Sequence, residues 1–140
     1  MTDTGVVVRV AGVVVDAMFR SGDLPGIHNA LRIRRDGDEP DLVIEVQEHI
    51  DPYTVRAVAM GATTGLRRGL AVVDIGSPIK VPVGSQTLGR LFNVLGEPID
   101  GKPSVTNSEL RSIHVSSPPL HEQRVVVEPF ITGIKAIDLL

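Results

Sequence analysis

The chain has 140 residues, no cysteine and a formal net charge of -3, and 42% of its residues are hydrophobic while only 3% are aromatic. The lack of cysteine excludes disulfides and thiolate chemistry, and the 14 basic residues form no run of the kind that marks a nucleic-acid surface. No stretch approaches the roughly 18 apolar residues of a membrane span, so we expect a soluble, cytosol-facing protein with an aliphatic core.

The first part of the chain contains short apolar runs separated by turn residues, which is the spacing of a small all-β barrel or sandwich. Val6 to Val10 and Val13 to Phe19 flank Ala11-Gly12, and the second run alternates apolar with polar side chains. This alternation places one face of a strand in a core and the other in water.

The next runs predict a hairpin. Apolar positions alternate from Leu31 to Ile33 and from Leu42 to Val46, and Asp36-Gly37 between them is typical of a turn. Two paired antiparallel strands are therefore expected.

Two further runs, Thr54 to Met60 and Leu70 to Ile75, bring the number of expected strands near six. Short strands with one apolar face each bury those faces by packing on one another, and closing the sheet removes its exposed edges. We therefore predict a mainly β fold with a closed six-stranded barrel at residues 1–76.

The character of the sequence changes after Ile75, where prolines come at short intervals: Pro78, Pro82, Pro98, Pro103, Pro118, Pro119 and Pro129. Proline at this density prevents long regular elements. We predict an irregular segment with one short helix from about Thr87 to Val94, followed by a loop from Gly96 to Ser112 that holds little that could pack.

The last residues fit the start of a second helix. Thr132 is an acceptable N-cap, and Ile134 and Ile137 have helical spacing just after it. A helical nucleus this short is unstable alone, so we expect more chain downstream of Leu140.

One segment, Gly84 to Leu91, has the glycine spacing of a phosphate-binding loop. That loop needs a lysine and then a serine or threonine directly after its second glycine, for the phosphates and for magnesium. Arg90 and Leu91 stand at those places, so we interpret the segment as structural.

Four histidines are present, and their spacing is not that of metal ligands; they are His28, His49, His114 and His121. Without such spacing, histidines are more often solvent-facing or in loops. We expect that arrangement here.

Two carboxylate pairs could in principle divide acid and base roles: Asp36 with Asp38, and Glu45 with Glu48. The first pair falls in the predicted hairpin loop and the second on the polar face of a predicted strand. A solvated surface is therefore expected for both.

Arg67 and Arg68 lie in the predicted turn Gly65–Gly69, where they could grip a phosphate or pair with a carboxylate of a neighbouring subunit. An exposed turn is the simpler interpretation. No set of residues supports catalysis on its own, so we expect no catalytic, cofactor-binding or metal-binding residue within this chain.

Seven segments, taken together and in this order, resemble the beta subunit of F-type ATP synthases. They are Leu24–Leu31, Thr54–Met60, Gly65–Gly69, Val81–Gly84, Thr87–Arg90, Asn93–Gly101 and Thr132–Leu140. Each is weak evidence alone, but seven collinear segments extend the similarity from about Val6 to the last residue.

The resemblance implies a six-stranded N-terminal barrel at residues 1–76 and, at residues 77–140, the incomplete start of an α/β nucleotide-binding domain. The phosphate-binding loop would follow Thr132–Leu140, so the catalytic lysine, glutamate and magnesium ligand would lie beyond this chain. The full-length protein would then bind ATP or ADP with Mg²⁺ and make or hydrolyse ATP. The 140-residue chain itself would bind neither and be inactive.

The resemblance also implies partners. Three such subunits would alternate with three noncatalytic alpha subunits in a hexamer held together by a crown of barrels, around a central-stalk subunit and coupled to a membrane sector. The complex would lie in the cytoplasm, peripheral to the inner face of the cell membrane, without direct membrane insertion and without nucleic acid.

Several positions depart from the usual pattern of that family, namely Thr64, Glu48–Asp51 and Ser117–Leu120. They indicate a divergent branch, such as a second type of beta subunit. Whether protons or sodium ions are transported, the direction of turnover and the oligomeric state of the piece stay open.

Within the family, the alpha subunit or a related rotary or secretion ATPase is the main alternative, since Gly133–Asp138 also suits alpha. Asn29–Leu31 and Asn93–Asp100 favour beta.

An alternative of another class is a nucleic-acid-binding barrel of the OB kind, which stacks bases on aromatic residues of one sheet face. The aromatic residues here are scattered, and they are Phe19, Tyr53, Phe92 and Phe130. Their scatter and the negative net charge argue against that function. A standalone interaction domain is disfavoured by the unfinished helical pattern at Leu140.

Overall fold

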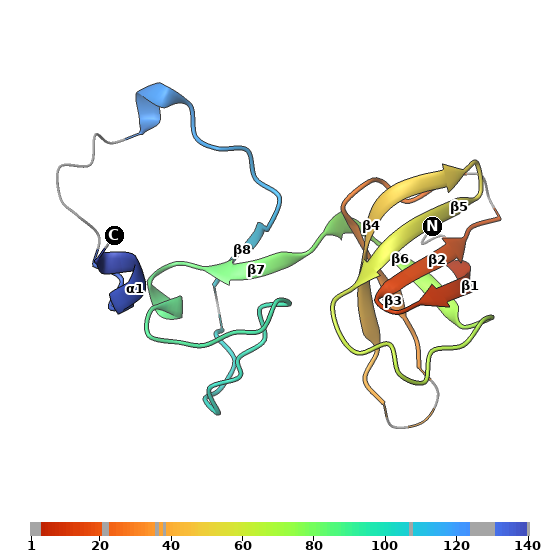
Figure 1. Ribbon diagram of the computed structural model, residues 1–140, viewed down its shortest axis with the longest axis horizontal. Helices are drawn as coiled ribbons and strands as arrows, with labels where there is room; N and C mark the ends of the chain where they lie inside the picture. Colours follow the sequence, from red (N-terminus) through yellow and green to blue (C-terminus); the bar gives the residue numbers. More distant parts are fainter. Residues whose placement is uncertain are drawn as a thin grey trace.

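The computed structural model describes residues 4–20, 23–35, 37, 39–106, 108–123 and 131–139. The barrel strands are β1 (Thr4–Ala11), β2 (Val14–Met18), β3 (Asn29–Ile33), β4 (Leu42–Asp51), β5 (Thr54–Ala59) and β6 (Ala71–Pro78). They form a closed antiparallel barrel in the order β1-β2-β5-β4-β3-β6 (Figure 1). The predicted mainly β fold with a closed six-stranded barrel is confirmed.

Two tight turns fix the register of neighbouring strands. Ala11 of β1 pairs with Val14 of β2, and Gly12 between them has φ 61°, a backbone conformation that glycine adopts readily. Asp51 of β4 pairs with Thr54 of β5, and the carboxylate of Asp51 accepts a hydrogen bond from the Tyr53 amide at 2.8 Å. Short loops of this kind fix the pairing register, which keeps the apolar side chains of each strand on the face toward the core.

The expected hairpin between the third and fourth strands is also present, since Leu31 pairs with Ile44 and Ile33 with Leu42. Its connection is longer than a tight turn, and Asp36 and Asp38 lie outside the described residues. The barrel closes because β6 pairs with β1 on one side and with β3 on the other.

Aliphatic side chains fill the interior of the barrel, together with one aromatic ring. The largest fully buried side chains are Phe19, Leu31, Ile33, Ile44, Val7, Val15, Val46, Val55 and Val72. Each contributes about 1.5–3 kcal/mol by leaving water, so this cluster is the main stabilising element of the barrel.

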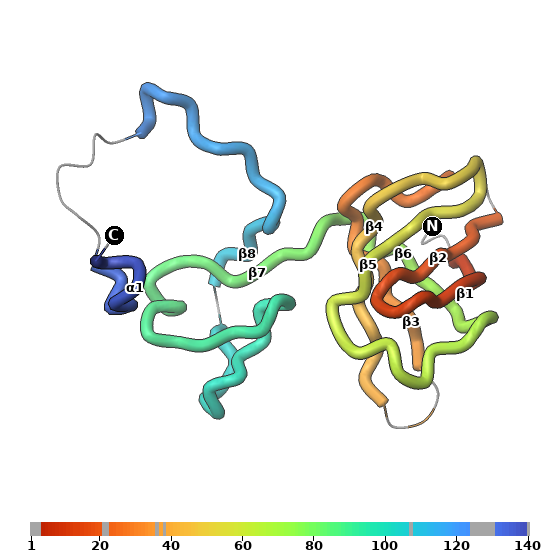
Figure 2. The backbone as a smooth tube through the Cα atoms, viewed as in Figure 1, coloured from red at the N-terminus to blue at the C-terminus, as the bar shows by residue number. Residues whose placement is uncertain are grey.

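The rest of the chain runs away from the barrel. Its elements are β7 (Lys80–Val83), the 3₁₀ turns η1 (Ser85–Thr87) and η2 (Leu120–Glu122), β8 (Glu109–Ser112) and α1 (Lys135–Asp138). β7 leaves the barrel and pairs with β8, and α1 lies at the far end of the molecule (Figure 2). Several large apolar side chains of this part face solvent, among them Leu88, Leu120, Ile131 and Leu139.

The predicted helix from Thr87 to Val94 is wrong. The single turn η1 ends at Thr87, and Gly89 then takes φ 67°, which a right-handed helix does not allow. The following residues extend and bridge back, with the Ile99 amide donating to the Leu91 carbonyl at 2.9 Å and Phe92 bridging Pro98. In this small hairpin, backbone groups that would bond one another in a helix find partners across the hairpin instead.

Two further expectations for this part need correction. The region from Gly96 to Ser112 was expected to pack little, yet its last residues form β8 and pair with β7. The terminal helix is present but begins at Lys135, and the Thr132 hydroxyl bonds the carboxylate of Asp138 at 2.7 Å instead of capping the helix as its N-cap. Across the described ranges, no helix is long and apolar enough to cross a membrane.

Candidate functional site

A charged cluster crosses the outer wall of the barrel over four neighbouring strands, and it consists of Arg9 (β1), Asp16 (β2), Arg56 (β5) and Glu48 (β4). Asp16 is only 5% exposed, and Arg56 grips it with two hydrogen bonds, Nε to Oδ1 at 2.9 Å and Nη2 to Oδ2 at 3.2 Å. Arg9 approaches the same carboxylate at 3.7 Å, and Glu48 approaches Arg56 at 3.7 Å.

The hydrogen bonds that Arg56 donates to Asp16, and next the negative charge of Asp16, raise the pKa of the Arg56 guanidinium. This arrangement binds strands β2 and β5 together and leaves a charged outer wall, which suits contact with a charged neighbour better than catalysis.

A second cluster lies where the chain beyond the barrel folds back onto it. Glu45 of β4 points outward yet is only 5% exposed, because the His28 and His114 rings and the Gln47 side chain surround it. His114 Nε2 lies 2.9 Å from Glu45 Oε2, and the two imidazoles stack with their centroids 4.0 Å apart. The expected solvated surface is therefore wrong for Glu45. His28 and His114 do lie in loops with partly exposed side chains, as expected, but their rings meet at this carboxylate.

No spacing in the sequence could have revealed this cluster, because Glu45 and His114 are 69 positions apart. The structure singles out His28 by its backbone, because it has φ 69° and is the only non-glycine residue with positive φ in the described chain. Such a conformation is uncommon for histidine and is held here by a hydrogen bond from its amide to the Val46 carbonyl at 2.8 Å.

The other two candidate histidines have different neighbours. His49 contacts the Pro25 carbonyl at 2.8 Å, and the His121 side chain is 78% exposed beside Glu122. Glu48 is exposed, as are Arg67 and Arg68 in their turn.

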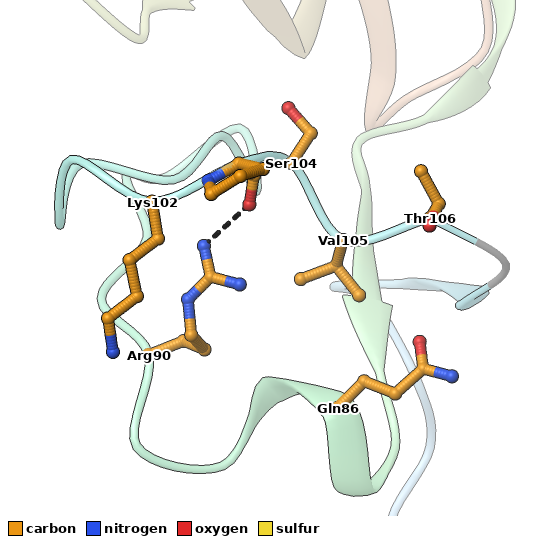
Figure 3. A pocket seen from close by; sticks show the side chains of 7 residues that line it. Gln86, Arg90, Lys102, Ser104, Val105 and Thr106 are labelled. Carbon is orange, nitrogen blue, oxygen red and sulfur yellow. Dashed lines mark hydrogen bonds between the residues drawn. The ribbon is translucent and has the colours of Figure 1, made fainter.

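The segment with phosphate-loop spacing is organised around Arg90. Its guanidinium donates from Nε to Asp100 Oδ2 at 2.6 Å and from Nη2 to Oδ1 at 3.1 Å. Nη2 also donates to the Pro103 carbonyl at 2.8 Å, the bond drawn in Figure 3. The hydrogen bond from Arg90 is the largest of the causes that hold the pKa of Asp100 well below its ordinary range. Hydrogen bonds from the amides of Lys102 and Leu91 also lower this pKa.

These bonds tie the Arg90 side chain to Asp100 and to the Pro103 carbonyl of the same chain. The open hollow beside it is lined by Gln86, Arg90, Lys102, Pro103, Ser104, Val105 and Thr106. The intrachain carboxylate occupies the guanidinium, so the geometry agrees with a structural role for this segment and gives no cradle of amides around a phosphate.

The aromatic residues do not form a stacking face in the part of the chain that the structure describes. Phe19 is fully buried inside the barrel, whereas Tyr53 is 54% exposed at a turn. Phe92 lies on the extension, which is the part of the chain that follows β6, and the Arg90 guanidinium is 5.7 Å from its ring centroid. Phe130 lies outside the described residues. Base recognition by stacking needs several exposed rings on one face, which these positions do not supply.

A closed antiparallel barrel with a packed interior and a charged outer wall defines a small all-β barrel domain. Residues 7–76 match the model of the ATP synthase alpha/beta family, beta-barrel domain, and this match covers half of the 140 residues. The chain therefore belongs to the ATP synthase alpha/beta family. At this level the resemblance seen in the sequence is confirmed.

Proposed function

We propose that this chain is the N-terminal part of the catalytic beta subunit of a rotary F-type ATP synthase, and that its barrel helps to hold a ring of subunits together. The observation that carries the proposal is the closed barrel of the ATP synthase alpha/beta family. A closed barrel has no unpaired strand edge, so it meets neighbours through side chains without the risk of open-ended strand pairing.

In this proposal residues 1–76 form the crown domain and residues 77–140 begin the nucleotide-binding domain. The apolar side chains exposed beyond the barrel support the second part, since Leu88, Leu120 and Leu139 are each at least 79% exposed. Side chains of this kind are expected to pack against further elements of a nucleotide-binding domain.

The full-length protein would bind ATP or ADP with Mg²⁺ through residues that follow this chain, and would make or hydrolyse ATP coupled to proton or sodium transport. Its partners would be alpha subunits in an alternating hexamer, a central-stalk subunit and a membrane sector. The complex would lie in the cytoplasm at the inner face of the cell membrane, and the 140-residue chain would not turn over ATP.

The assembly role is tested by deleting residues 1–76 from the full-length subunit and co-expressing it with the alpha subunit. The undeleted subunit is the control, native mass spectrometry measures the hexamer, and Mg²⁺-dependent ATP hydrolysis measures function. We expect the deletion to abolish the hexamer. A stable hexamer with normal turnover would show that the barrel has no crown role.

The choice of beta over alpha rests on Asn93–Asp100 and Asn29–Leu31 and is tested by sequencing the gene beyond the codon for Leu140. A glycine-rich loop ending in Lys-Thr, followed later by Gly-Glu-Arg, is expected for the catalytic subunit. A loop with a different lead-in would instead support the alpha subunit or a secretion ATPase.

A further inference from the structure

Three side chains with metal-binding atoms meet on the outer wall of the barrel, and they come from three separate parts of the chain. His28 directly precedes β3, Glu45 lies in β4, and His114 follows β8. One ligand atom from each lies within 4.8 Å of the others. Two of the residues belong to the barrel and the third belongs to the extension.

One nitrogen of this cluster is left without a hydrogen-bond partner among the described residues. Glu45 Oε1 accepts a hydrogen bond from Gln47 at 2.7 Å, and Oε2 faces His114 Nε2 at 2.9 Å. His28 Nδ1 is buried and has no hydrogen-bond partner among the described residues, although Glu45 Oε1 is only 3.9 Å away. Buried polar atoms normally have a partner, so an unpaired ring nitrogen beside a buried carboxylate is a signal for a missing ligand.

The distances suit a small cation. Zinc bonds to histidine nitrogen and carboxylate oxygen are about 2.0–2.2 Å long, which places ligand atoms of a tetrahedral site about 3.3 Å apart. The separations of 2.9 Å and 3.9 Å bracket that value.

Binding requires the rings to turn, because a ring nitrogen coordinates in the plane of its ring and the two rings now stack at an interplanar angle of 22°. The His28 side chain is 45% exposed and the His114 side chain is 36% exposed, which leaves room for that rotation.

The donor set selects the kind of metal. Two imidazole nitrogens and one carboxylate oxygen suit zinc and neighbouring transition metals, whereas Mg²⁺ and Ca²⁺ prefer sites made only of oxygen. A fourth position would be left for water, as in zinc sites with three protein ligands.

We propose that His28, Glu45 and His114 form a binding site for one divalent transition-metal ion, with zinc as the best fit, and that the ion fastens the extension to the barrel. The ion would bridge β4 and the segment after β8, which are separated along the chain by β5, β6, β7, η1 and β8. Binding would therefore fix the orientation of the extension on the outer wall of the barrel. The proposal is independent of whether the chain is a beta or an alpha subunit.

Two substitutions remove the ligands while preserving the local structure. His28→Asn keeps a side chain that tolerates positive φ, and His114→Gln keeps an amide donor for Glu45. His121→Gln is the matched control, because this histidine is exposed and lies beside Glu122 instead of Glu45.

Zinc binding to the 140-residue chain is measured by isothermal titration calorimetry, with Mg²⁺ titrated in parallel and circular dichroism used to verify folding. We expect one Zn²⁺ per chain, at least tenfold weaker binding in His28→Asn and in His114→Gln, unchanged binding in His121→Gln, and no binding of Mg²⁺ at the same site. X-ray absorption of the zinc-loaded chain should show nitrogen and oxygen neighbours with the outer-shell scattering of imidazole.

Zinc should also raise the melting temperature of the unchanged chain and of His121→Gln, but not of the two ligand variants, because an ion that binds only the folded state stabilises it. A chain that binds no zinc would overturn the proposal. So would zinc binding that both ligand variants retain in full, or binding that is lost in His121→Gln instead.

Discussion

The barrel and the extension beyond it have similar aliphatic sequences but opposite relations to solvent. Val7, Leu31 and Ile44 of the barrel are at most 1% exposed, whereas Leu120 and Leu139 of the extension are at least 83% exposed. Closing six strands on one another lets each strand bury a complete face, while a two-stranded ribbon cannot bury either face fully. The comparison shows that the barrel is stabilised by its own buried core, whereas the extension is held in place by a few polar contacts.

The sharpest test of this comparison makes the same substitution in both regions. Leu31→Ala in the barrel core should reduce the free energy of unfolding by about 2–5 kcal/mol, because it removes buried methyl groups and leaves a cavity. Leu120→Ala should change it by no more than about 0.5 kcal/mol, because this side chain already faces solvent. Urea denaturation followed by circular dichroism measures both, and equal losses would contradict the contrast between the regions.

The polar cluster on the outer wall gives the next largest effect. Asp16→Asn keeps the shape of the side chain but removes the negative charge that Arg56 and Arg9 share. We expect a loss of about 2 kcal/mol, less than for a fully buried pair because Arg56 is partly exposed. Asp23→Asn at an exposed position is the control, and thermal or urea unfolding of the two variants should separate them clearly.

The barrel could be predicted from the sequence because its signal is local. Alternation with a period of two from Leu42 to Val46 and the turn residues Ala11-Gly12 each specify a strand or its end without reference to distant residues. One closed sheet satisfies all the local signals of this kind.

What the sequence could not predict depends on contacts between distant residues. Glu45 occupies a polar position of an alternating strand and is buried in part because His114, 69 positions away, returns to cover it. Likewise, the residues from Leu88 to Val94 have helical spacing, but the pairing of Arg90 with Asp100 and the left-handed Gly89 fold them into a hairpin. Local propensity is overridden wherever a distant partner supplies better hydrogen bonds.

A glycine of the extension tests how tightly this hairpin packs. Gly96 has φ 77°, and a Cβ added there would lie 2.5 Å from Pro82 Cδ, whereas Gly101 has φ 72° and open space around it. Gly96→Ala should therefore disturb the hairpin more than Gly101→Ala. We expect amide hydrogen exchange near Asn93 to be roughly tenfold faster, about 1.4 kcal/mol of local stability, with barrel amides unchanged. Equal exchange in the two variants would mean that the packing against Pro82 is unimportant.

The smallest expected effect concerns the acid sensitivity of the Arg90–Asp100 pair. The hydrogen bond from Arg90 lowers the pKa of Asp100 in the folded chain below the usual value of 3.8. A carboxyl whose folded pKa is depressed contributes stability above its unfolded pKa and loses that contribution as pH falls through the folded value. The pair should therefore persist through the pH range in which exposed aspartates become protonated, and release only in stronger acid.

An NMR titration of the Asp100 carboxyl carbon measures this directly. Arg90→Gln removes the first cause of the shift, so the pKa of Asp100 should rise toward its ordinary value of 3.8. Arg68→Gln, at an exposed position in a turn, should leave the titration of Asp100 where it was. If Arg90→Gln left it in place as well, the backbone amides of Lys102 and Leu91 would be the groups that hold this carboxylate, and the hairpin would owe its acid resistance to its backbone.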